Sequence, residues 1–174
     1  MSNFFELANQ SFNSDNDIRS ARFADTKSHL IASFTGDHAF LSNFYPQGFY
    51  MKNQWFKSAE HAFQAAKAFI PEERQSIIDS CSARDARSIG WKCSPIDGWE
   101  DMRIEVMREV LSCKFSVTNL TEMLLATDEK YLIEGNNWED RFWGCEIVRG
   151  KFVGENNLGK LLMEIRQEFQ TESK

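Results

Sequence analysis

The sequence is poor in the residues that build structural metal sites. Its four cysteines contain no CxxC pair, and its three histidines are scattered along the chain. Structural zinc sites use closely spaced cysteine and histidine ligands, so none is expected here and no metal is predicted. Because the start of the chain predicts a cytoplasmic location, the thiols are expected to be reduced.

Long apolar runs and an excess of basic residues are also missing. No run approaches 18 apolar residues, so no membrane-spanning helix and no membrane partner are predicted. The first six residues lack the basic and apolar segments of a signal peptide, which favours a cytoplasmic location. The net charge of −6 does not favour broad binding to a nucleic-acid backbone.

Familiar catalytic signatures are absent as well. There is no Walker loop, no GxGxxG after a strand, no HExxH and no GxSxG, and no local pattern supports a Cys–His nucleophile pair. Any chemistry must therefore come from carboxylates, amides and aromatic residues. Aromatic side chains are abundant, with 15 phenylalanines and five tryptophans, and some of these rings are expected to be available to stack on a ligand.

Length and pattern predict one mainly helical α+β domain with a few short strands. The chain has 174 residues and 42% hydrophobic content, enough for one core. Residues 1–27 are polar and predicted to be an N-terminal extension, which leaves 28–174 as the domain. Strands or hairpins are expected at 29–34, 49–55, 131–134 and 142–153, with a bend at Lys52-Asn53, and helices at 58–69, from 71, 82–90, 97–115, 119–126 and from 156. Ser82, Asp97 and Asn119 are expected to cap the helices that begin at them.

The central helix has the clearest boundaries. Ser58 is a suitable N-cap and Pro71 disfavours helix before it. An apolar arc is expected on one side, formed by Ala62, Phe63, Ala65, Ala66, Phe69 and Ile70. On the other side Glu60, Gln64 and Lys67 form a polar stripe.

This polar stripe has two interpretations. It is either a solvated face, with Glu60 favoured by the helix dipole, or a carboxylate, an amide and an amine that line a pocket. Glu60 and Lys67 lie about 10 Å apart along the axis at about 1.5 Å per residue, a gap that accommodates one sugar ring.

Asn43 presents a similar choice in the loop before this helix. Large apolar residues flank Ser42 and Asn43, so the loop is expected to be ordered by its aromatic side chains. Asn43 then either caps the turn or points into a binding site.

Four motifs in order resemble the NADAR superfamily of YbiA-like N-glycosidases. Residues 56–67 (FKSAEHAFQAAK) are similar to its EHxFQAxK helix, and 41–44 (LSNF) to its SNF loop. Residues 132–134 (LIE) with 140–144 (DRFWG) resemble its D-x-x-WG loop, and 154–166 (GENNLGKLLMEIR) its GxNxLGxLLMxIR ending. Two segments depart from the commoner pattern: Phe56-Lys57-Ser58 replaces Trp-Pro-Thr, and residues 145–149 replace a Gly-rich segment, which leaves the substrate open.

The resemblance implies hydrolysis of the bond between a ribose and a nitrogen base. The implied substrates are early riboflavin intermediates with a phosphorylated ribose, or ADP-ribosylated guanine, including guanine in nucleic acid. Glu60 would stabilise positive charge on the sugar, and Lys67 would either donate hydrogen bonds to it or attack C1′ to form a Schiff base. No cofactor is implied.

Substrate-binding roles are implied for six further residues: Asn43, Gln64, Asp140, Trp143, Gly144 and Asn156. Each has a structural alternative, since Trp143 also suits a core, Asp140 a turn and Asn156 a helix N-cap. Glu134 is either a second carboxylate or a partner in a salt bridge, and His61 is expected to support the site or the packing and not the chemistry. A non-catalytic module that binds ADP-ribose or a nucleotide remains the alternative to an enzyme.

Overall fold

The computed structural model describes residues 29–149 and 151–172, so the predicted N-terminal extension lies outside the described residues. The described chain divides into two compact units. We call residues 40–126 the helical unit, and residues 29–39 together with 127–172 the sheet unit. Throughout the described ranges, no helix combines the length and apolar character needed to cross a membrane.

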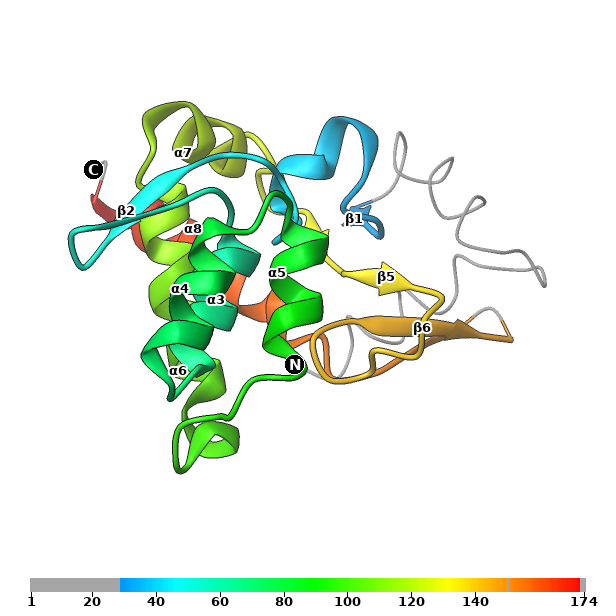
Figure 1. Ribbon diagram of the computed structural model, residues 1–174. Coiled ribbons are helices and arrows are strands. Elements are labelled where there is room, and N and C mark those ends of the chain that lie inside the picture. The colour runs from blue at the N-terminus through cyan, green and yellow to red at the C-terminus, as the bar shows by residue number, and fades with distance from the viewer. Residues whose placement is uncertain (1–28, 150, 173–174) are drawn as a thin grey trace. The chain divides into compact units, whose positions relative to one another are not determined.

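The helical unit is built around α3. This helix packs against α4, α5 and α6, and the hairpin strand β2 packs on α6 (Figure 1). The elements of the unit are β2 (Phe49–Met51), β3 (Gln54–Phe56), α3 (Ala59–Lys67), α4 (Pro71–Asp79), α5 (Ala83–Gly90), α6 (Trp99–Phe115) and α7 (Thr118–Leu125). The short 3-10 helix η1 (Gly36–Leu41) precedes them.

The predicted hairpin is confirmed, and its turn has the expected geometry. Strands β2 and β3 pair antiparallel, with Met51 opposite Gln54. The two residues between them, Lys52 and Asn53, have φ values of 50° and 64°. Two left-handed residues form the turn whose twist matches a hairpin, which is why the bend falls there.

Helix α3 begins where predicted but ends earlier. The Ser58 hydroxyl accepts a hydrogen bond from the His61 backbone N–H, so this N-cap is confirmed. The helix ends at Lys67 because Ala68 is extended and the Phe69 N–H donates to the Ser94 carbonyl at 2.8 Å. The predicted apolar arc is therefore wrong at its end, where Phe69 is 70% exposed.

One of the three other predicted N-caps is confirmed, and two are not. Ser82 caps α5 as predicted, accepting from the Asp85 N–H at 3.2 Å. Gly98, at φ 73°, is the N-cap of α6, and Val117 is the N-cap of α7. The predicted caps at Asp97 and Asn119 are therefore wrong, although α6 ends at Phe115 as predicted.

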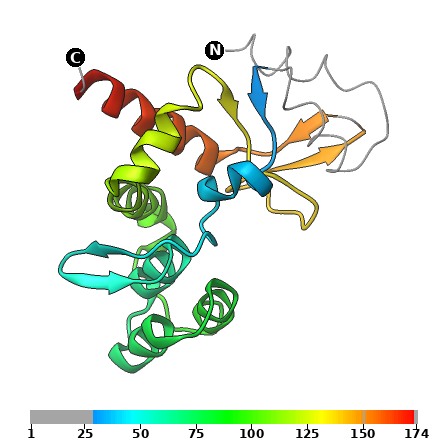
Figure 2. The ribbon, with the colours of Figure 1, turned by 90° about the horizontal axis from the view of Figure 1, so that it is seen from above.

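The sheet unit contains two small sheets and the last helix. Its elements are β1 (Leu30–Ile31), β4 (Tyr131–Leu132), β5 (Gly135–Asn136), β6 (Cys145–Val148), β7 (Lys151–Val153) and α8 (Asn157–Glu172). β1 and β4 pair in parallel, and β5 pairs in parallel with β6, which forms a hairpin with β7 (Figure 2). Residues 135–136 were expected to be a loop, so their pairing in β5 corrects that prediction.

Each unit has its own apolar core. In the sheet unit the core contains Leu30, Ala32, Ile133, Cys145 and Phe152. In the helical unit the fully buried side chains include Phe56, Ile77, Met107, Leu111, Phe115, Leu120 and Leu124. The mixture of helices with short strands confirms the predicted α+β class.

Candidate functional site

The polar stripe on α3 is buried at Glu60 and Gln64 and half-buried at Lys67. Glu60 is only 6% exposed and Gln64 only 5% exposed. The interpretation of this stripe as a solvated face is therefore wrong. Acidic side chains are rarely buried without a specific partner, so the burial of Glu60 points to a built polar site.

The Gln64 amide donates a hydrogen bond to Glu60, while its oxygen has no hydrogen-bond partner among the described residues. Its Nε2 donates to Glu60 Oε1 at 2.9 Å, which holds the carboxylate in place. Among the described residues, no hydrogen-bond partner is found for Gln64 Oε1 or for the buried Asn43 Oδ1. A buried acceptor without a partner costs about 1–3 kcal/mol, so both oxygens are suited to a ligand that brings donors.

Lys67 ends the stripe on the partly buried side of α3. Its Nζ donates to the Gly90 carbonyl at 2.8 Å, and the Cys93 thiol donates to the same oxygen at 3.1 Å. The Gln64 side chain also lies directly against Gly90. The end of α5 therefore covers two members of the stripe and fixes where they point.

Gly90→Ala tests this cover. A Cβ at position 90 would collide with the Gln64 side chain. We expect the free energy of unfolding to fall by about 1–3 kcal/mol, the usual range for overpacking, and catalytic activity to fall with it. Ser88→Ala, at an exposed position of the same helix, is the matched control and should be neutral or slightly stabilising. Equal effects of the two variants in chemical denaturation would contradict the role of Gly90.

The loop that carries Asn43 is attached to both α3 and α6. The Glu60 N–H donates to the Asn43 carbonyl at 3.0 Å, which places Asn43 at the start of α3. Asn43 Nδ2 contacts Met107 Sδ at 3.5 Å, and Lys114 Nζ donates to the Ser42 carbonyl at 2.8 Å. The four helical-unit residues predicted for the site, Asn43, Glu60, Gln64 and Lys67, are thus linked by α3 and its contacts.

Lys114 is a positioning residue that the sequence did not reveal. It is fully buried, and its ammonium group lies 4.9 Å from the centroid of the Phe115 ring. No local pattern in the sequence distinguishes it from a surface lysine. Seven residues after Met107, it lies on the same face of α6, and both side chains hold the loop 42–43.

His61 supports packing, as expected. Its Nδ1 lies 2.8 Å from Ser58 Oγ and its Nε2 lies 3.3 Å from the Ser80 carbonyl. Because a carbonyl only accepts, Nε2 carries the proton and Nδ1 accepts from the serine hydroxyl. Burial is the main cause that lowers the pKa of His61, and the nearby Lys57 lowers it further.

This lowered pKa predicts a pH dependence of stability. The folded state favours neutral His61, so its contribution is complete above the ordinary histidine pKa of about 6.5 and is lost as the pH falls below that value. We expect the Tm of the wild type to fall more steeply than that of His61→Gln between about pH 7 and pH 5. Parallel Tm profiles for the two proteins would show that His61 does not cause the dependence.

In the sheet unit, the predicted site residues lie in one connected loop. Asp140 Oδ1 accepts hydrogen bonds from the Phe142 and Trp143 N–H groups at 3.2 and 2.9 Å, so Asp140 shapes a turn. Trp143 is half-buried, with its ring edge-on to Phe142 at 4.9 Å. Gly144 lies directly against the Glu134 carbonyl, where a side chain would not fit.

Asn156 ties this loop to the strands. It is fully buried with φ 55°. Its Nδ2 donates to the Leu132 carbonyl at 2.8 Å, and its Oδ1 accepts from the Glu134 N–H at 3.1 Å. Its own N–H donates to the Gly144 carbonyl at 3.2 Å. The side-chain contacts of Asn156 therefore hold the backbone that follows β4.

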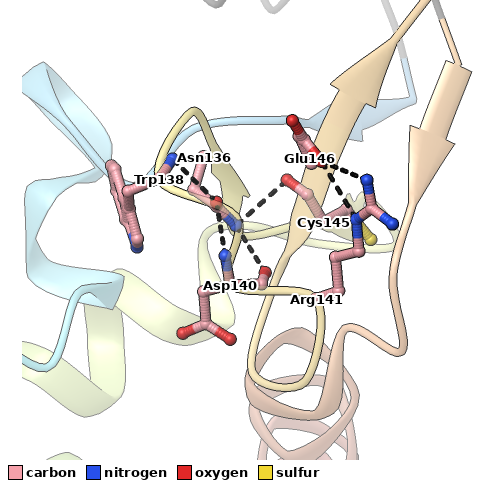
Figure 3. A network of polar contacts seen from close by, with 6 residues as sticks. All are labelled: Asn136, Trp138, Asp140, Arg141, Cys145 and Glu146. Carbon is pink, nitrogen blue, oxygen red and sulfur yellow. Dashed lines mark hydrogen bonds and ion pairs between the residues drawn. The ribbon is translucent and has the colours of Figure 1, made fainter.

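Asn136 is a second positioning residue that the sequence did not single out (Figure 3). Its Nδ2 donates to the Asp140 carbonyl at 2.7 Å and to the Cys145 carbonyl at 3.2 Å. Its Oδ1 accepts from the N–H groups of Trp138 and Asp140 at 3.3 and 3.1 Å. One buried amide thus fixes the loop between β5 and β6. On the surface beside it, Arg141 pairs with Glu146 at 2.7 Å.

The described residues offer donors and acceptors for an organic substrate. In the ranges 29–149 and 151–172, no group of three or more histidine, cysteine, aspartate or glutamate side chains is arranged to hold a metal ion. A carboxylate, two amides and an amine on and beside α3 can bind hydroxyl and amino groups and can stabilise a nearby positive charge.

Comparison with known proteins connects this arrangement to one family. The profile of the NADAR domain matches residues 27–170. The protein named N-glycosidase Npun_R5314 from Nostoc punctiforme is 32% identical over 138 residues, which cover 75% of this chain and 85% of that protein. The riboflavin biosynthesis protein VVA0006 from Vibrio vulnificus is 34% identical over 137 residues, 77% of this chain but only 36% of that protein.

A solved structure agrees with the sequence matches. The N-glycosidase YbiA from Escherichia coli is 31% identical over 161 residues, which cover 89% of this chain and 98% of that protein. Its NMR structure matches with a TM-score of 0.72 over 82% of this chain and 84% of that chain.

Proposed function

We propose that this chain, which belongs to the NADAR domain family, is an N-glycosidase that uses Glu60 to hydrolyse the bond between a ribose and a nitrogen base. One observation carries the assignment of Glu60. A carboxylate that is only 6% exposed is held by an amide whose own oxygen has no hydrogen-bond partner within the described part of the chain. Two relatives named as N-glycosidases support the reaction class.

The carboxylate acts where charge develops. As the C1′–N bond breaks, the bonding electrons leave with the base, and positive charge builds on C1′ and the ring oxygen. Glu60 stabilises that charge from a position shielded from water, where an electrostatic contribution is large. A water oxygen then bonds to C1′ and its proton passes to Glu60. Glu60 hands a proton on to the departing nitrogen, so the base is released neutral and the carboxylate is restored.

Lys67 and the two amides hold the sugar in this proposal. Gln64 Oε1 and Asn43 Oδ1 accept from ribose hydroxyls or from amino groups of the base. Lys67 either donates hydrogen bonds to the sugar or, as a neutral amine, attacks C1′. In the second case the C1′–N bond to the base breaks, the bond from C1′ to the ring oxygen then opens with proton transfer from the amine to that oxygen, and water later hydrolyses the resulting Schiff base. In both roles a substrate oxygen or carbon replaces the Gly90 carbonyl as the partner of the amine.

The relatives and the same donor set support a choice of substrate class. We favour a small molecule, a 5-phosphorylated ribose carried by an early riboflavin intermediate, because one relative is named as a riboflavin biosynthesis protein. ADP-ribosylated guanine, free or in nucleic acid, is the second substrate. The binding roles of Asp140, Trp143, Gly144 and Asn156 and a cytoplasmic location stay predictions.

A substrate panel tests the proposal. Phosphoribosylamino-pyrimidines, ADP-ribosylated guanine nucleotides, NAD and ADP-ribose are incubated with the protein, and released sugar and base are detected by mass spectrometry. We expect free ribose 5-phosphate or ADP-ribose from at least one of the first two. If no compound is cleaved although nucleotides bind, the chain is the non-catalytic binding module.

A further inference from the structure

A half-buried arginine contacts two aromatic rings beside the α3 stripe. The guanidinium carbon of Arg87 is 4.8 Å from the centroid of the Trp91 ring and 5.9 Å from that of Phe44. Trp91 is 69% exposed and Phe44 is 37% exposed, so both rings present surface to solvent. We call Phe44, Arg87 and Trp91 the ring–arginine stack. All three belong to the helical unit.

The stack is attached to both ends of the polar stripe. Phe44 follows Asn43, whose carbonyl accepts from the Glu60 N–H at 3.0 Å. Trp91 follows Gly90, whose carbonyl accepts from Lys67 Nζ at 2.8 Å. Consecutive Cα atoms are about 3.8 Å apart. The Cα atoms of Phe44 and Trp91 therefore lie within about 4 Å of those of Asn43 and Gly90, the residues whose carbonyls bind Glu60 and Lys67.

Two buried acceptors next to the stack indicate that a ligand belongs there. One is Oδ1 of Asn43, the residue before Phe44 in the chain. The other is Gln64 Oε1, which lies against Gly90, the residue before Trp91. Both side chains are at least nine-tenths buried, and neither oxygen has a hydrogen-bond partner among the described residues. A ligand with polar hydrogens and a flat face suits both features.

We propose that the ring–arginine stack binds the flat face of the substrate's nitrogen base, the leaving group of the reaction. This inference rests on the proposed function and names the part of the substrate that the stack recognises. Aromatic rings and guanidinium planes stack on any heterocyclic base because every base has a π face. Arg87 keeps the indole oriented, and its positive charge favours the electron-rich face of the base as that base takes up the bonding electrons.

If the stack binds the base, Trp91→Ala should weaken the binding of a nucleotide but not that of a sugar phosphate. Loss of one base–aromatic contact typically weakens binding by about tenfold, within a range of roughly five- to hundredfold. The variant should therefore bind guanosine 5′-monophosphate about tenfold more weakly than the wild type, yet bind ribose 5-phosphate equally well. Trp91→Phe keeps a π face and should restore most of the affinity. Phe69→Ala, which removes another exposed aromatic of the same unit, is the matched control.

Isothermal titration calorimetry with these two probes decides the proposal without turnover. It is supported if wild type prefers the nucleotide and Trp91→Ala removes that preference alone. It is overturned if wild type does not prefer the nucleotide, if Phe69→Ala has the same effect, or if Trp91→Ala weakens both probes equally, which would indicate a phosphate or sugar contact. Failure of hydrolysis in the substrate panel leaves this binding result intact, so the two proposals fail separately.

Discussion

Glu60→Gln is expected to lower kcat by about a thousandfold while the affinity for substrate stays within a few-fold of the wild type. The amide keeps the shape of the side chain and can still accept the hydrogen bond from Gln64 Nε2, which is 2.9 Å in the wild type. What is lost is the negative charge that stabilises the sugar cation and the base that takes the proton from water. Single-turnover release of sugar, measured together with binding, separates the two effects.

The matched control for this variant is Glu122→Gln, which removes the same charge from an exposed position of α7. It should leave kcat unchanged, because an exposed charge away from the reacting atoms is screened by solvent. Thermal unfolding of both variants shows whether they remain folded. A folded Glu60→Gln enzyme with wild-type turnover would falsify the catalytic assignment of Glu60.

Asn156→Ala should lower the free energy of unfolding by roughly 3 kcal/mol, equivalent to a Tm lower by about 10 °C. The substitution removes two buried side-chain hydrogen bonds, to the Leu132 carbonyl and from the Glu134 N–H. It also places a Cβ-bearing residue with no polar side chain at φ 55°, a left-handed conformation that asparagine tolerates better than alanine. Differential scanning calorimetry measures the shift.

Asn119→Ala is the control for Asn156→Ala. Asn119 is exposed in the first turn of α7, where Val117 and not Asn119 is the N-cap. Its replacement should change the free energy of unfolding by less than about 0.5 kcal/mol. If Asn156→Ala proves as stable as the wild type but binds substrate poorly, Asn156 contacts the ligand and does not stabilise the fold.

The sequence identified the elements whose signals are local. Ser58 and Ser82 cap their helices because each hydroxyl reaches a backbone N–H three residues ahead. The bend at Lys52 and Asn53 likewise depends on two adjacent residues. The caps at Asp97 and Asn119 were predicted wrongly because Gly98 and Val117 begin those helices without a side-chain hydrogen bond, and so leave no pattern to find.

Pairing and burial were harder to predict because they depend on residues far apart in the sequence. The strand β5 exists because Gly135 lies opposite Cys145, ten positions away, and two residues are too few to show a period. Lys114 would ordinarily be placed on the surface, yet it is buried because the Ser42 carbonyl, 72 positions earlier, accepts a hydrogen bond from its ammonium group.

The order of four motifs was sufficient by itself to assign the family, and with it the class of reaction and the choice of Glu60, because residue identity and spacing are properties of the chain alone. Only the tertiary structure decided that the α3 stripe is buried. A helix repeats its faces every 3.6 residues whatever surrounds it, so the same pattern suits a solvated or a covered face. The stripe is covered because Gly90 has no side chain. The end of α5 can therefore lie against Gln64, and the Gly90 carbonyl can accept a hydrogen bond from Lys67.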